Sequence, residues 1–153
     1  MTNNMKRARS ILILTAAVVF IAAAADVIQT QDSDTWDGIA ADLTQLSIKN
    51  DVLTLRFKIR NEGSDSPRIE FLFRDCYIVD ESNQKKYFLL KDAEGQYIAG
   101  PKEKEWDGGR FSYIVEPEKT KGLWMKLPVP TDNPDTISIS IPGFFPFEEV
   151  SLK

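Results

Sequence analysis

Residues 53–60 (LTLRFKIR) place an apolar side chain at each odd position and a polar or charged one at each even position. This alternation is the period of a β-strand with one buried and one solvent-facing side, because successive side chains of a strand point to opposite faces. Weaker alternation returns in residues 69–73, 111–115, 123–127 and 137–141. No segment after residue 25 keeps a helical period for more than about two turns, so the sequence predicts an all-β domain.

Turn-forming residues divide the domain into seven to nine predicted short strands. Strands of this number and spacing are typical of an antiparallel immunoglobulin-like β-sandwich, and a small β-barrel, which has the same periodicity, stays open as an alternative. The alternation changes phase at Asp75, which predicts a β-bulge there. Residues 91–109 are mostly polar and rich in glycine, and they are interpreted as the longest loop.

The first 25 residues have the layout of a secretory signal peptide. Lys6, Arg7 and Arg9 precede an uncharged run over residues 11–25, and the run ends in an A-x-A pattern that predicts cleavage after Ala25. A helix of this run rises about 22 Å, short of the roughly 30 Å hydrocarbon core. An uncleaved inner-membrane anchor is the alternative. The predicted organisation is a signal peptide (1–25), a polar linker (26–42) and a β-sandwich domain (43–153).

Charge and composition exclude several classes of protein. Residues 26–153 contain 16 Lys and Arg against 23 Asp and Glu, a formal charge of −7, whereas nucleic-acid binders need a basic surface. The chain has no histidine and a single cysteine, Cys76, which excludes catalytic sites that need His and zinc sites built from His or from four Cys. Cys76 lies in a strand-like run and is predicted to be a buried, unpaired thiol.

The remaining catalytic and metal candidates are weak. Glu103 with Glu105, or Asp75 with Asp80, could act as acid and base of a carboxylate-dependent hydrolase, but solvated surface charge is the expected role of such residues. Residues 32–38 (DSDTWDG) resemble the start of a calcium loop yet lack its glycine and closing Glu. We therefore predict a non-enzymatic protein with no cofactor and no metal site.

Aromatic residues are the best candidates for binding. In residues 123–127 (LWMKL) the odd positions form the apolar face, so Trp124 is predicted to face outward, where it binds a sugar ring or a partner or is covered by the 91–109 loop. Phe144 and Phe145 are the other predicted ligand-binding residues. Trp-Asp-Gly occurs at 36–38 and 106–108, and we interpret this repeat as turn chemistry.

Several segments resemble one known family. They are residues 55–64 (LRFKIRNEGS), 69–71 (IEF), 79–87 (VDESNQKKY), 120–122 (TKG) and 128–130 (PVP). Together they resemble the immunoglobulin-like domain of unknown function that is common in bacterial lipoproteins and exported proteins, over about residues 43–152. The resemblance implies a sandwich fold and no catalytic residues. That family usually carries an acylated cysteine after its leader, which this chain does not have.

These observations predict an exported, periplasmic or secreted β-sandwich that acts as a binding or interaction module of the bacterial cell envelope. Its expected partner is a protein or a glycan of the envelope, with no nucleic acid, and with membrane contact only through residues 11–25 if the leader is retained. The alternative is a membrane-tethered structural or accessory subunit of an envelope assembly.

Overall fold

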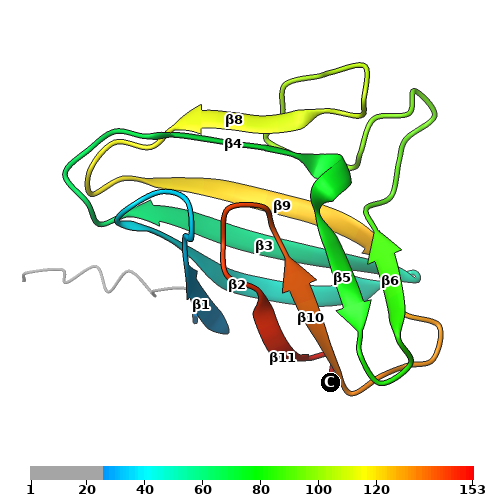
Figure 1. The fold of residues 1–153 in the computed structure, drawn as a ribbon. Helices are drawn as coiled ribbons and strands as arrows, with labels where there is room; N and C mark the ends of the chain where they lie inside the picture. Colours follow the sequence, from blue (N-terminus) through cyan, green and yellow to red (C-terminus); the bar gives the residue numbers. More distant parts are fainter. Residues whose placement is uncertain (1–25) are drawn as a thin grey trace, which may run out of the picture.

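The computed structural model describes residues 26–153, which form eleven β-strands and one 3-10 helix, η1 (Phe73–Asp75) (Figure 1). The prediction of an all-β domain with antiparallel sheets is confirmed, with more strands than the seven to nine expected. No helix within residues 26–153 is long and apolar enough to cross a membrane. The predicted signal peptide lies outside the described residues.

One face of the fold is a five-stranded antiparallel sheet with the order β1-β2-β3-β9-β7. Its strands are β1 (Gln29–Asp32), β2 (Ile39–Lys49), β3 (Val52–Asn61), β9 (Thr120–Pro128) and β7 (Ala99–Gly100). β2 and β3 form a hairpin whose two turn residues, Asn50 and Asp51, both have positive φ. Such a turn matches the right-handed twist of the strands, and Asn and Asp tolerate the left-handed conformation it needs.

The other face contains a four-stranded antiparallel sheet, β11-β10-β5-β6, and the two-stranded pair β4-β8. Its strands are β11 (Phe147–Ser151), β10 (Thr136–Ser140), β5 (Tyr77–Asp80), β6 (Lys85–Phe88), β4 (Arg68–Leu72) and β8 (Arg110–Ile114). In Figure 1, β10, β5 and β6 cross in front of the five-stranded sheet, and β4 and β8 run above β9. The layers enclose a single apolar core, in which Phe57 of β3 meets Phe147 of β11 with ring centroids 5.3 Å apart. This arrangement is that of a β-sandwich.

The change of phase at Asp75 has a different cause from the predicted bulge. η1 ends β4 after Leu72, and the chain then enters β5, so the flanking strands belong to different sheets. Phe73, the first residue of η1, and Cys76, which follows it, are both buried. A 3-10 turn re-aims the side chains as a bulge does, but here it also moves the chain from one sheet to another.

The segment predicted to be a polar linker is part of the sheet. Residues 29–32 form edge strand β1, and β2 begins at Ile39, so residues 26–42 contribute strands instead of a tether. β1 alternates half-buried and exposed polar side chains, and an edge strand of this kind gives no apolar pattern to detect. Asp42, also assigned to the linker, is buried.

Candidate binding surface

The outward side of the five-stranded sheet carries the predicted Trp124 site. Along β3, Leu55, Phe57 and Ile59 are buried, and the alternating positions Arg56 and Lys58 are exposed. The register of β9 places Trp124 opposite Arg56 and Gly122 opposite Lys58. Two cations, one indole and one glycine therefore form a square on the outer face of two neighbouring strands.

Trp124 faces outward as predicted, because its neighbours Leu123 and Met125 are both buried on the inner side. Its indole is half-buried, since the 91–109 segment returns beside it and Gly100 of β7 pairs with it in register. A Cβ on Gly100 would lie 2.9 Å from a ring carbon of Trp124, so this close approach requires glycine. Trp124 therefore lies on the outer face of the sheet and is also partly covered by the 91–109 segment.

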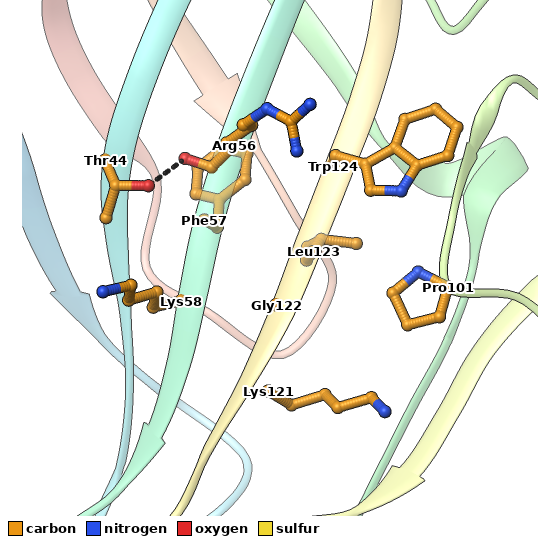
Figure 2. Close-up of a pocket in the computed structure, with 9 residues that line it drawn as sticks. All are labelled: Thr44, Arg56, Phe57, Lys58, Pro101, Lys121, Gly122, Leu123 and Trp124. Carbon is orange, nitrogen blue, oxygen red and sulfur yellow. Dashed lines mark hydrogen bonds between the residues drawn. The ribbon is translucent and has the colours of Figure 1, made fainter. Parts of the chain in front are cut away.

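A depression of about 430 Å³ lies beside this indole. It is lined by Thr44, Arg56, Phe57, Lys58, Pro101, Lys121, Gly122, Leu123 and Trp124. Figure 2 shows the Arg56 side chain reaching toward Trp124, the Trp124 ring above Pro101, and none of the drawn side chains over Gly122. A Cβ added at Gly122 would meet no atom within 4 Å, so the missing side chain is what opens the floor of this depression. We call it the Trp124 depression.

Arg56 and Lys58, the two cations of β3 in the Trp124 depression, form no direct ion pair. Within residues 26–153, neither Arg56 nor Lys58 has a carboxylate within ion-pair distance. The next cation along β3, Arg60, is paired with both Asp42 and Glu62. The outer face of β3 therefore presents two cations without a direct partner, in a domain that carries 23 acidic residues.

Asp42 and Arg60 form the polar boundary of this surface. Arg60 Nη2 donates to Asp42 Oδ1 at 3.0 Å, Arg60 Nε donates to the other oxygen, and Thr30 Oγ1 donates to Oδ1 at 2.7 Å. Burial raises the pKa of Asp42, but these hydrogen bonds and the charges of Arg60 and Lys58 outweigh it and hold the pKa below its usual range. The hydrogen bond to Asp42 raises the pKa of Arg60.

Phe144 and Phe145 are not brought together with Trp124. Phe144 is 4% exposed and packs on Trp36, with ring centroids 5.8 Å apart. Phe145 is 52% exposed and lines a second depression of about 390 Å³, which shares no residue with the first. Its lining residues are Asp32, Ser33, Asp37, Gly38, Ile39, Ala40, Glu62 and Phe145. We call it the Phe145 depression.

The carboxylates considered for acid–base chemistry have other partners. Glu103 and Glu105 both pair with Arg110, at 3.1 and 3.2 Å, and Asp80 is buried and accepts hydrogen bonds from Asn83. The His, Cys, Asp and Glu side chains of residues 26–153 form no group of three or more that could hold a metal ion. Cys76 is a buried free thiol, and burial, with the nearby Asp75 charge, raises its pKa well above the usual range.

Four residues of the Trp124 depression were not among the predicted site residues: Arg56, Lys58, Pro101 and Gly122. The signal for the two cations was present, because both occupy the polar phase of the clearest predicted strand. Pro101 and Gly122 approach Trp124 and Lys58 only through the pairing of β7 and β3 with β9, which no local pattern encodes.

Comparisons with known protein families, with curated proteins and with solved structures find no match for this chain.

Proposed function

We propose that this protein is an exported, non-enzymatic binding module of the bacterial cell envelope, built as an immunoglobulin-like β-sandwich, and that the Trp124 depression binds an anionic partner. The observation that carries the proposal is the pair of unpaired cations, Arg56 and Lys58, beside an outward indole. Ten of the sixteen Lys and Arg in residues 26–153 have no carboxylate within ion-pair distance, and among them Arg56 and Lys58 share the outer face of β3 beside Trp124.

The chemistry of the depression suits a partner that carries carboxylates next to a flat apolar part. A guanidinium binds a carboxylate with two parallel hydrogen bonds, and an ammonium adds a point charge. The face of an indole packs against a sugar ring or an aliphatic side chain. Gly122 leaves the space between these groups empty, so a partner can reach the sheet surface.

The partner is an acidic protein segment or an anionic glycan, and not a nucleic acid. Duplex DNA and RNA present dense phosphate charge, and their binding requires a broad basic surface. The Trp124 depression is a small area, and the Phe145 depression on the same sheet carries Asp32, Asp37 and Glu62. A long polyanion lying across both would meet repulsion.

Titration calorimetry at low ionic strength tests this proposal with poly-L-glutamate and polygalacturonate as anionic probes and dextran, an uncharged polymer, as the control. We expect at least one polyanion to bind, and the double substitution Arg56→Ala with Lys58→Ala to weaken binding about tenfold or more. Lys86→Ala is the matched control, because Lys86 is a cation of β6 that lies over the Tyr77 ring on the other sheet. Absence of binding by both polyanions, or equal binding by the double variant, would overturn the proposal.

Export is tested separately by mass spectrometry of the protein recovered from the periplasm or medium. We expect Asp26 to be the N-terminus. Recovery only from the membrane fraction, with residues 1–25 intact, would instead support the tethered accessory subunit.

A further inference from the structure

The edge of β9 next to the Trp124 depression is only partly paired. β3 pairs with β9 along nine positions, from Val52 with Pro128 to Arg60 with Thr120. On the opposite side, β7 pairs only with Met125 and Trp124, and the chain turns away at Pro101. Within residues 26–153, therefore, no strand pairs with residues 120–123 on this side.

The open edge presents backbone hydrogen-bonding groups. Successive residues of a strand turn their N–H and C=O groups to opposite sides, and Lys126 N donates to Ile98 O, on the side of β7. The β3–β9 ladder has no bulge, so every even-numbered residue of β9 has the same orientation. Gly122 therefore directs its N–H and C=O toward the open edge, whereas Leu123 directs its own toward β3.

Each side of this edge has a distinct chemistry. On the outer face lies the Trp124 depression with Lys58 and Arg56. On the other side lies a further depression of about 430 Å³, lined by Ile114, Val115, Glu116, Lys119, Thr120 and Lys121. Ile114 is 54% exposed there, and Lys121, which lines both depressions, places its Nζ over the Tyr113 ring at 4.2 Å.

We propose that an extended peptide with alternating acidic and apolar residues binds by adding a strand to β9 along residues 120–123, in line with β7. This inference rests on the proposed function and specifies its partner as a protein segment. Side chains of an added strand that share the outward face of Gly122 extend over this glycine toward Lys58, which suits a carboxylate. Side chains of the other phase point toward Ile114 and Tyr113, which suits an apolar residue.

The charge around the edge favours an acidic strand. Lys58, Lys119 and Lys121 line the two depressions, and Glu116 is the single carboxylate among the residues that line them. Lys119 has no ion-pair partner among the described residues. A glycan offers no row of N–H and C=O groups to Gly122, so the open backbone edge favours a peptide over an anionic sugar.

The experiment uses a capped peptide in which Glu and Val alternate. Its length of about eight residues lies within the usual range for a β-strand. Two analogues carry N-methyl groups, one on its Glu residues and the other on its Val residues. In the added strand the Glu residues face outward and hydrogen-bond to Gly122, so their N-methylation is expected to weaken binding more than about tenfold. N-methylation of Val is expected to change binding far less.

Amide hydrogen exchange measured by NMR gives a direct second readout. On peptide binding, exchange of the Gly122 amide is expected to slow by about tenfold or more, and that of Leu123, already directed toward β3, to change little. Gly122→Glu has open space for its Cβ and is expected to repel the peptide, and Ser47→Glu on β2 of the same sheet is the matched control.

Equal binding of both N-methylated analogues, without protection of Gly122, would overturn strand addition and leave the binding of anions intact. Binding of polygalacturonate but not of the peptide would also overturn it, with the proposed function standing. A dimer that Gly122→Glu disrupts, together with no peptide binding, would replace the peptide by a second copy of the chain. Failure of the peptide and of both polyanions would refute both proposals.

Discussion

The Trp124 depression and the Phe145 depression are similar in size and opposite in charge. Each is lined by an aromatic side chain and a glycine, and each lies on the five-stranded sheet or its edge. The first is bordered by Arg56 and Lys58, which lack acidic partners in residues 26–153. The second is bordered by Asp32, Asp37 and Glu62.

This difference shows that exposure of an aromatic ring does not by itself identify the binding surface. Phe145 is the more exposed ring, yet its surroundings match the charge of the whole domain and add nothing distinctive. Trp124 is half-covered, but the charge around it runs against that of the domain. The Asp42–Arg60 pair lies between the two, because Lys58 of one depression and Glu62 of the other both act on it.

The largest expected effect separates the two neighbouring phenylalanines. Phe144→Ala removes a buried ring that packs on Trp36 and is expected to lower the free energy of unfolding by about 3–4 kcal/mol. Phe145→Ala removes a half-exposed ring and is expected to cost about 1 kcal/mol or less. Urea unfolding followed by tryptophan fluorescence measures both. Equal losses would mean that Phe145 belongs to the core.

The next effect compares the glycines beneath the two tryptophans. Gly143 has a φ of +84°, and a Cβ there would overlap the Trp36 ring, so Gly143→Ala is expected to cost about 2–3 kcal/mol. Gly100 has no positive φ, and the atoms closest to an added Cβ belong to the half-buried Trp124 side chain. Gly100→Ala is therefore expected to lower the free energy of unfolding by only about 1 kcal/mol. Thermal unfolding of both variants checks the order. A larger loss of stability for Gly100→Ala than for Gly143→Ala would show that the Trp124 ring cannot move aside any more easily than the Trp36 ring.

The third effect is a pH dependence at the boundary between the depressions. The pKa of Asp42 is lower in the folded protein than in the unfolded chain, so its ion pair stabilises the fold above about pH 4 and this stability is lost as the pH falls further. Asp42→Asn is expected to cost about 1–2 kcal/mol at pH 7 and little near pH 2. Urea unfolding at a series of pH values measures the difference, and an equal loss at both pH values would contradict this role.

The sequence predicts the inner layer of this fold better than its edges. β3 and the outward phase of Trp124 follow from alternation alone, because a half-buried strand must alternate. β1 was not predicted, because its side chains are polar on both faces and its place in the sheet depends on pairing with β2.

The different burial of Phe144 and Phe145 also escapes prediction. The two residues follow a turn in which Phe144 N donates to Ile141 O and Gly143 has positive φ. No strand period applies across such a turn, so adjacent residues of the same type can take opposite environments. Pro101, which follows β7, and Gly122 reach the Trp124 depression through register between distant strands, which no local pattern specifies.

The smallest expected effect on stability is the one most informative about binding. Arg56→Glu and Lys58→Gln replace exposed cations that have no carboxylate within ion-pair distance among the described residues, so the free energy of unfolding is expected to change by less than about 0.5 kcal/mol. Arg60→Glu is the control on the same strand, because it breaks the pair with the buried Asp42 and is expected to cost about 2 kcal/mol or more. Chemical denaturation of the three variants tests this contrast. Comparable destabilisation by all three would mean that Arg56 and Lys58 maintain the sheet, whereas a loss confined to Arg60→Glu leaves binding as the role of the unpaired cations.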